Sequence, residues 1–468
     1  MVALEEVEAR TSRRSLKAMI LKASSWILAG HFLSLSIRFV GTLVLSRIFT
    51  PEVFGIMAVV LSVQIVTHLF TDIGISQAVI QSPSGRDSAF LNTAWTIQVM
   101  RGFLIWGLGL LVAVCLMLAD HFAWLAAGSV YAYPELPAIL AVACLSAVIM
   151  GFQTTKVFLA SRDMDMKRVT IIDLTSQLVA LAFTITAGYL TRSIWSYVVA
   201  GLLNSFLSVA MSQLFLKGAR NHFALDPTAL QRLSKFGGWI FASSGMGGLA
   251  ANGDRVILGG IVTPAVLGLY SIASNLVAVV DGVAGRIFGM VALPALSAIA
   301  RDNPGQLPSL LHRIRLFVDP CMVALAGFIY AAAPTIISSL YDARYAEASA
   351  MLKILSLGLL FTRYNLAQSV YISLGLPNYL VVLNIARLAS ITGLIPLFFY
   401  LGGEEGAVLA IALHMVPVAA ITLYLNSLHK LNNFKLELFV LCFWPAGWAA
   451  GIGIDRAVAL LRTSALGS

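Results

Sequence analysis

Four arginines lie inside otherwise apolar stretches of this sequence: Arg38, Arg255, Arg363 and Arg387. Burying a charge without a partner is costly, so each arginine is expected either to face a polar cavity or to pair with a nearby Asp. A guanidinium binds phosphate or carboxylate oxygens through two parallel hydrogen bonds, and it stays charged when partly buried. Arginines that face a cavity would therefore form a site for an anion.

Two polar stripes accompany the arginines. One consists of His31, Ser34, Arg38 and Thr42, and the other of Gln64, His68 and Asp72. Spacings of three and four residues place each set on one face of a helix, as a cavity wall or as a hydrogen-bonded seam between helices. His68 and Asp72 join a titratable imidazole to a carboxylate one turn away, so they are candidate ligands for a coupling proton or cation. His31, Gln64 and Asp254 are predicted to line the polar cavity.

Motifs for nucleotides and metals do not occur in the sequence. There is no GxxxxGK[ST] phosphate loop, which excludes an ATP-driven pump built from this chain alone. The four cysteines, Cys115, Cys144, Cys321 and Cys442, lie far apart in apolar runs without a CxxC spacing. They are predicted to be buried apolar side chains, and no cofactor or metal is expected.

The composition indicates that most of the chain is surrounded by membrane lipid. The chain has 468 residues, of which 59% are hydrophobic and only 11% are charged. A soluble domain is roughly half apolar and a quarter charged, so most of this chain must be embedded in a membrane. Long apolar runs without alternation predict helices rather than a barrel. About thirteen such segments occur, near 24–48, 53–80, 91–118, 136–158, 169–190, 194–216, 236–260, 264–290, 315–340, 349–373, 378–401, 404–427 and 437–455.

The basic residues predict the orientation of the segments. With the basic tail 1–23 in the cytoplasm, alternating segments place twenty Lys and Arg on the cytoplasmic side and five outside. Such a bias is the positive-inside signal, and the odd number of segments puts the C-terminus outside. The net charge of +9 therefore reflects topology, and no nucleic acid partner is expected.

An internal repeat divides the chain. The nine residues 50–58 (TPEVFGIMA) match 263–271 (TPAVLGLYS), each between two apolar segments. Six segments separate the copies, so the halves share one orientation, and repeats of this kind place a transport site between two halves. We expect a cytoplasmic tail 1–23, an N-lobe 24–216, a cytoplasmic linker 217–235, a C-lobe 236–427 and a C-terminal hydrophobic segment 428–468, which either spans the membrane or re-enters it.

Several motifs in a fixed order resemble one known family. They are Arg-x-x-x-Pro-x-x-Phe-Gly at 47–55, an amphipathic stretch at 158–168, Asp254-Arg255 followed by Pro264, Gly268 and Tyr270, and Pro-Ala-Leu-Ser at 294–297. The sequence thus resembles the polysaccharide-transporter, or Wzx-like oligosaccharide flippase, branch of the multidrug/oligosaccharidyl-lipid/polysaccharide (MOP) flippase superfamily. The resemblance covers most of residues 20–430. Members usually carry twelve or fourteen spans.

The resemblance implies a fold and a substrate. The fold would be all-α, with about 13 (12–14) transmembrane helices in two six-helix lobes around a central cavity. The activity would be alternating-access export of an undecaprenyl-diphosphate-linked oligosaccharide across the bacterial inner membrane, for exopolysaccharide, capsule or O-antigen. Membrane lipid and a polysaccharide polymerase would be its partners. The diphosphate carries about two negative charges, which Arg38, Arg255, Arg363 and Arg387 would bind.

Two other classes stay open from the sequence. One is a drug/cation antiporter of the same superfamily, although arginines in the cavity would repel cationic drugs. The other is a membrane-bound polymerase or ligase. Such an enzyme needs catalytic groups outside the membrane, and the longest outer loop, 119–135, offers only Asp120, His121 and Glu135.

The predicted orientation is testable at residues 162–168, a charged stretch expected at the cytoplasmic surface. In a chain whose native cysteines are replaced, Met164→Cys should react with a membrane-impermeant maleimide only in inside-out vesicles. Ser129→Cys, in the predicted outer loop, should react only from the other side. Labelling of Met164→Cys in intact cells would contradict the orientation.

Overall fold

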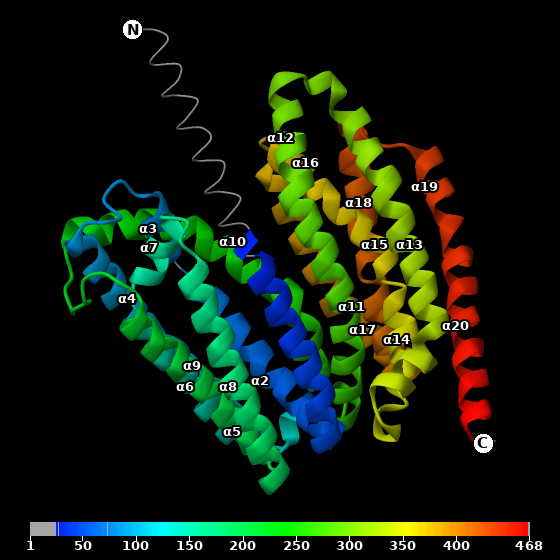
Figure 1. The fold of residues 1–468 in the computed structure, drawn as a ribbon, viewed down its shortest axis with the longest axis horizontal. Coiled ribbons are helices and arrows are strands. Elements are labelled where there is room, and N and C mark those ends of the chain that lie inside the picture. Colours follow the sequence, from blue (N-terminus) through cyan, green and yellow to red (C-terminus); the bar gives the residue numbers. More distant parts are fainter. Residues whose placement is uncertain (1–24, 27, 73, 467–468) are drawn as a thin grey trace. The chain divides into compact units, whose positions relative to one another are not determined.

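The computed structural model describes residues 25–26, 28–72 and 74–466. This part of the chain is helical and contains no β-strand (Figure 1). Nine of its helices are long and apolar enough to cross a membrane, and a tenth span results if the bent pair Leu136–Gly151 and Lys156–Arg162 is counted as one. The predicted tail 1–23 lies outside the described residues. The chain is thus a multi-pass, all-α membrane protein, as the sequence predicts.

The first half consists mainly of long helices. A helix over Leu28–Ile48 is followed by α2 (Pro51–Phe70), α3 (Ile75–Gln81), α4 (Ser88–His121), α5 (Leu136–Ala143), α6 (Leu145–Gly151), α7 (Lys156–Arg162), α8 (Lys167–Thr191) and α9 (Trp195–Phe215). Two-residue to four-residue breaks separate most neighbours. The predicted segment 136–158 is bent by 65° where α6 gives way to α7.

The second half contains more broken helices. It runs through α10 (Pro227–Gly259), α11 (Pro264–Ile287), α12 (Leu293–Asp302), α13 (Leu307–Leu340), α14 (Ala348–Ser356), α15 (Leu359–Thr362), the 3₁₀ turn η5 (Arg363–Asn365), α16 (Leu366–Ser373), α17 (Pro377–Leu413), α18 (Met415–Leu428), α19 (Phe434–Leu441) and α20 (Phe443–Leu466). The predicted single helix 349–373 is therefore three short helices around a 3₁₀ turn. Within α17, Gly403 has a φ of 60°, which turns the chain between the predicted segments 378–401 and 404–427.

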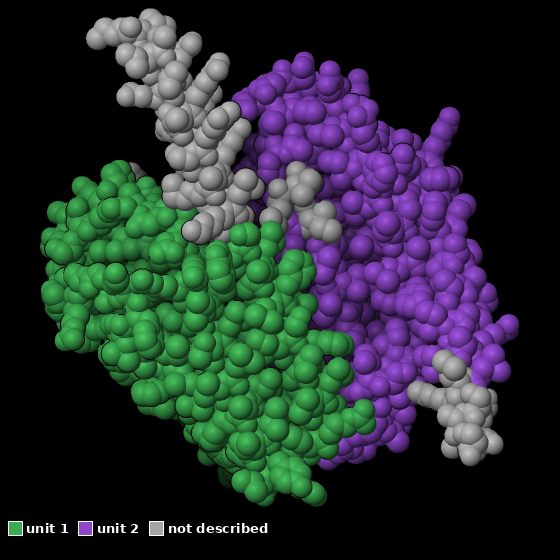
Figure 2. All heavy atoms as spheres, in the orientation of Figure 1, with its two compact units in different colours: residues 1–49, 63–124, 134–245 green, residues 50–62, 125–133, 246–468 purple. Residues whose placement is uncertain are grey.

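The chain forms two compact units (Figure 2). Unit 1 comprises residues 1–49, 63–124 and 134–245, and unit 2 comprises 50–62, 125–133 and 246–468. The division into the lobes 24–216 and 236–427 stays a prediction. The start of α2, however, belongs to unit 2, and so does the C-terminal segment 428–468.

The predicted linker 217–235 is part of unit 1 and is hydrogen-bonded to α4. The backbone N–H of His222 donates to Asn92 Oδ1 at 3.2 Å, and that of Asp226 donates to Thr93 Oγ1 at 2.9 Å. Thr96 Oγ1 donates to the carbonyl of Ala224 at 3.0 Å. The three α4 side chains are buried, so the linker supplies hydrogen bonds that water would otherwise provide.

The two copies of the repeat contact each other inside unit 2, at the starts of α2 and α11. A Cβ on Gly55 would lie 1.9 Å from the carbonyl oxygen of Pro264, and one on Gly268 would lie 1.8 Å from that of Pro51. Only glycine permits such close backbone approach, which is the usual way that membrane helices pack. The repeated Pro and Gly therefore have a packing role: proline begins each helix and glycine allows the crossing.

The crossing predicts a contrast between two glycines of α11. Gly268→Ala should lower the melting temperature of the purified protein sharply, because overpacking costs about 1–3 kcal/mol and backbone carbonyls cannot move aside cheaply. Gly282→Ala is the matched control, since a Cβ there meets nothing within 4 Å. It should leave stability unchanged or raise it by up to about 1 kcal/mol. Equal melting temperatures for the two variants would contradict the crossing.

Candidate functional site

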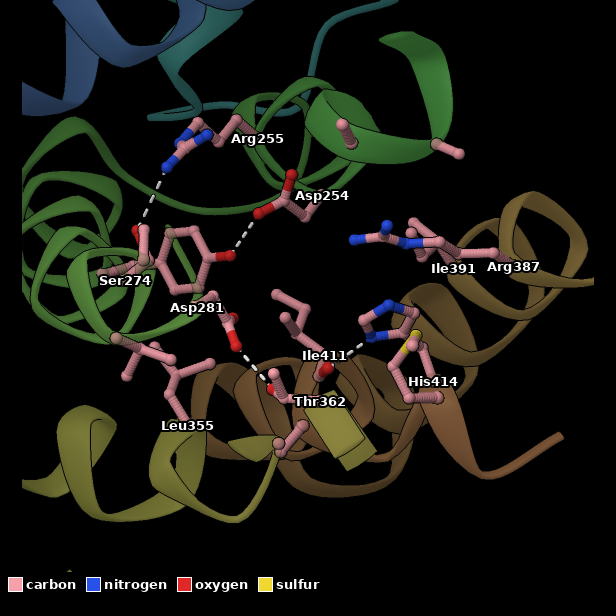
Figure 3. Close-up of a pocket in the computed structure, with 18 of the residues that line it drawn as sticks. Asp254, Arg255, Ser274, Asp281, Leu355, Thr362, Arg387, Ile391, Ile411 and His414 are labelled. Atoms are coloured by element: carbon pink, nitrogen blue, oxygen red, sulfur yellow. Dashed lines mark hydrogen bonds between the residues drawn. The ribbon is translucent and has the colours of Figure 1, made fainter. Parts of the chain in front are cut away.

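A polar cavity of about 240 Å³ lies within unit 2 (Figure 3). Residues of α10, α11, α14, α15, η5, α17 and α18 line it, together with the residue that links α17 to α18 and the one before α15. The polar lining consists of Asp254, Arg255, Tyr270, Ser274, Asp281, Thr362, Asn365, Arg387 and His414. Irregular backbone at membrane depth is tolerated where it lines such a cavity, which accounts for the break at η5.

Hydroxyl groups hold the two carboxylates of the cavity. Tyr270 donates its hydroxyl hydrogen to Asp254, and Thr362 donates to Asp281. Asp254 Oδ1 remains buried without a hydrogen-bond partner. The acids are thus partly satisfied by neutral donors and not by the arginines.

The arginines of the cavity keep unused donors. Arg255 Nη2 donates to Ser274 Oγ at 3.2 Å, and Arg387 Nε is buried without a partner. Within the part of the chain that the structure describes, neither guanidinium forms an ion pair within 4.0 Å. In Figure 3 the guanidinium of Arg387 points into the space beside Asp254 and His414. Both guanidinium groups therefore line the cavity without a carboxylate partner among the described residues.

His414 adds one more unpaired polar atom. Its Nδ1 lies at the carbonyl oxygen of Ile411, which can only accept, so Nδ1 carries the hydrogen. In that tautomer Nε2 is an acceptor, and it is buried without a partner. A cavity with unsatisfied atoms on an acid, an arginine and a histidine is a typical place for a ligand, since such atoms are otherwise rare in folded proteins.

Arg363 has a different environment from Arg255 and Arg387. Its Nη2 lies 3.2 Å from Glu437 Oε2, and the side chain is buried outside the cavity lining. Arg315 pairs with the same Glu437 at 2.7 Å and with Asp319 at 2.8 Å. The buried ion network that these four residues form joins α13, η5 and α19.

Arg38 belongs to unit 1, where it is exposed on the helix Leu28–Ile48. In the same stripe, Ser34 Oγ donates to Gln177 Oε1 of α8 at 2.9 Å. His31 is half-buried on this helix. At Ser34, the stripe is a hydrogen-bonded seam between neighbouring helices.

The second stripe lies in unit 1 and meets α4 and α5. Gln64 Nε2 donates to the carbonyl of Ala143 at 2.6 Å. Arg101 of α4 binds both His68 and Asp72: its Nη2 lies 3.1 Å from His68 Nδ1, and its Nη1 lies 3.6 Å from Asp72 Oδ1. Because a guanidinium only donates, His68 Nδ1 is the acceptor. The structure thus brings the candidate coupling pair together around a third residue, Arg101.

Several site residues are absent from the predicted set. Of the four arginines, the cavity brings together Arg255 and Arg387, along with the predicted Asp254. Asp281 met the same criterion as the arginines, an ionisable group within an apolar run. His414 also lies within an apolar run, and Tyr270 belongs to the motif that begins at Asp254.

The prediction for the cysteines is wrong at three of the four positions. Only Cys144 is buried, whereas Cys115, Cys321 and Cys442 are exposed on the surface of apolar helices. In a membrane that surface faces lipid, so an apolar thiol gains nothing from burial. No cluster of three or more His, Cys, Asp or Glu suited to a metal occurs among the described residues.

Solved structures with the same arrangement of helices are membrane transporters. The lipid II flippase MurJ, in its inward closed conformation, superposes with a TM-score of 0.61 at 15% identity, covering 94% of this chain and 100% of MurJ. A multidrug resistance MATE family transporter of the MOP superfamily, in an inward-facing conformation, gives a TM-score of 0.59 at 16% identity, covering 86% and 96%. The likeness shows that the chain shares the fold of these two proteins.

The sequence assigns the family within that fold. The profile of the family described as "Polysaccharide biosynthesis protein" matches residues 44–350, and the chain belongs to this family. A curated relative is the "Lipopolysaccharide biosynthesis protein WzxC" of Escherichia coli (strain K12), 22% identical over 292 residues, or 62% of this chain. The match spans 56% of that relative's length. The chain is therefore a member of a polysaccharide biosynthesis family, and it has the fold of these two solved transporters.

The cluster at Arg101 yields a test of ion coupling. If His68 and Asp72 bind the coupling ion, Asp72→Asn should abolish the dependence of transport on a proton or sodium gradient, because the ligand loses its charge. Transport in proteoliposomes under imposed gradients measures this. Asp163→Asn, which removes an exposed partner of Arg86, is the control. An unchanged gradient dependence in Asp72→Asn would assign these residues to a structural seam.

Proposed function

We propose that this chain flips a polyprenyl-diphosphate-linked oligosaccharide across the bacterial inner membrane by alternating access, in the synthesis of exopolysaccharide, capsule or O-antigen. The proposal rests on one observation. Arg255 and Arg387 line the same cavity, and no carboxylate among the described residues contacts either guanidinium group. They would bind the diphosphate while the polyprenyl tail stays in membrane lipid.

The charge of the substrate requires such a site. A diphosphate carries about two negative charges, which cannot enter hydrocarbon without compensation. Two guanidinium groups match that charge and offer forked donors to phosphate oxygens. The acids of the same cavity already accept hydrogen bonds from Tyr270 and Thr362. The arginines are therefore the side chains of this cavity that would donate hydrogen bonds to the anion.

The size of the cavity suits a head group and not a sugar chain. Its volume of about 240 Å³ lies below the roughly 300–1,000 Å³ of pockets that enclose a whole small-molecule ligand. The oligosaccharide would lie outside this cavity in the proposed complex. Sugar contacts of that kind are spread over many hydrogen bonds, so specificity for one repeat unit would not reside in the arginines.

The membrane potential supplies a driving force for an anion. Moving one negative charge outwards gains roughly 2.3 kcal/mol per 100 mV, which makes a nucleotide unnecessary. A polysaccharide polymerase at the outer face would consume the product. Arg38 and Arg363, predicted from the sequence for the same role, have other surroundings, so the proposal places the diphosphate on Arg255 and Arg387.

A drug/cation antiporter is the second candidate. Asp254 and Asp281 line the same cavity and favour a cation. Two arginines beside them would repel a cationic drug, and this weakens the alternative. The two candidates therefore predict opposite effects of removing the guanidinium groups.

Replacing the arginines tests the proposal. Arg255→Ala and Arg387→Ala should each lower export of polysaccharide by about 10-fold or more, since a hydrogen bond to a charged group contributes about 1.5–3 kcal/mol. Lysine at either position should restore export only in part, because it lacks the fork. Export from cells is measured against protein abundance in the membrane fraction.

The matched control is Arg301→Ala, because Arg301 is exposed and pairs only with its neighbour Asp302 among the described residues. Its export should equal that of the parent. Proteoliposomes with a fluorescent lipid-linked sugar or a cationic dye separate the two candidates. Normal export by both Ala variants would show that the diphosphate binds elsewhere, and faster dye transport by Arg387→Ala would favour the antiporter.

A further inference from the structure

One wall of the cavity is a break in a helix. Between α15 and α16 the chain forms the 3₁₀ turn Arg363–Asn365. Thr362 and Asn365 line the cavity, where Thr362 bonds to Asp281. The two residues between them do not line it. A 3₁₀ turn is a weak element on its own, so something outside it must hold this orientation.

A carboxylate from the C-terminal segment makes that contact. Glu437 Oε2 lies 3.2 Å from Arg363 Nη2 and accepts a hydrogen bond of 3.0 Å from the hydroxyl of Tyr364. The guanidinium of Arg363 stacks over the Tyr364 ring, with 4.9 Å from Cζ to the ring centroid. One glutamate therefore binds both residues of the turn that face away from the cavity.

Glu437 is itself held from other directions. Its second oxygen, Oε1, accepts from Arg315 Nη2 of α13 at 2.7 Å. Asn433 caps the start of α19, with its side chain accepting from the N–H of Leu436 at 3.2 Å. Glu437 is nine-tenths buried, so water does not compete strongly for its oxygens.

The next helix, α20, which is red in Figure 1, packs against α13. A Cβ on Gly447 would lie 1.8 Å from the carbonyl oxygen of Ala324, and one on Gly451 would lie 2.6 Å from that of Phe328. Two helices at this separation cannot slide without clashes. The carboxylate of Glu437 thus sits on a rigid support.

We propose that Glu437 is a positioning residue for the cavity: it holds Arg363 and Tyr364, and thereby keeps Thr362 and Asn365 turned to the cavity and Thr362 within reach of Asp281. The role of this wall in transport rests on the proposed function above. The C-terminal segment 428–468, which lies outside the two predicted lobes, would then contribute to the site through this one side chain.

The geometry of the wall is measured without substrate. In the full chain with the four native cysteines replaced, Asn365→Cys is labelled in detergent with 2-sulfonatoethyl methanethiosulfonate. Glu437→Gln removes the charge and keeps the shape, so the turn should open more often, and labelling should accelerate by at least about fivefold. Glu437→Asp, which keeps the carboxylate, should return the rate towards that of the parent.

Two controls separate positioning from general loosening. Ala278→Cys lines the same cavity on α11, and its labelling rate should not respond to Glu437→Gln. Asp455→Asn removes another carboxylate of the C-terminal segment, one that bonds Thr335 of α13 away from the turn. It should leave the rate at Asn365→Cys unchanged. Acceleration at Ala278→Cys, or equal acceleration by Asp455→Asn, would overturn the proposal.

A milder substitution keeps the proposal testable if Glu437→Gln does not fold. Tyr364→Phe removes only the hydroxyl that donates to Glu437, and it should accelerate labelling less than Glu437→Gln. Unchanged rates in every variant of Glu437 and Tyr364 would also overturn the proposal. The labelling rates could change as expected while Arg387→Ala exports polysaccharide normally. That result would support the positioning role of Glu437 and would contradict the proposed diphosphate site.

Discussion

A charge inside apolar surroundings must find a partner, and this constraint organises unit 2. No water within the hydrocarbon can replace a missing hydrogen bond. Arg315 and Glu437 therefore meet in one buried network, and Asp254 and Asp281 accept from hydroxyl groups. Buried atoms without a partner remain on both sides of this division. Arg387 Nε and His414 Nε2 border the cavity, whereas Arg363 Nε and Nη1 lie in the ion network.

Close helix packing provides the rigidity that this arrangement needs. Apolar side chains gain little by leaving lipid for another helix, so contacts depend on small residues that bring backbones together. Gly55 and Gly268 do this between the starts of α2 and α11, and Gly447 does it between α20 and α13. The same residue type serves two purposes in the chain, since Gly403 instead turns the backbone with a positive φ.

Residues at breaks between helices form part of the cavity lining. The turn η5 presents Thr362 and Asn365 to it, while His414 lies between α17 and α18. Thr362 and Asn365 are three residues apart, so they share one face of the chain, and Arg363 and Tyr364 between them face away from it. The sequence 349–373 gives no proline or glycine at 362–365 to mark this break. The two residues at the centre of the break, Arg363 and Tyr364, contact Glu437, a residue more than seventy positions away.

The sequence by itself determined what depends on composition, run length and local repetition: a multi-pass helical membrane protein, the approximate ends of most spans and the motifs typical of a polysaccharide-transporter family. It also identified Arg255, Arg387 and Asp254, because an ionisable residue within an apolar run is visible without a structure. Only the tertiary structure decided which arginines share a cavity. Arg363 and Arg387 look alike in sequence, but one lies against Glu437 and the other faces open space. The distinction depends on which distant helix supplies the counter-charge, and periodicity along one helix carries no information about that.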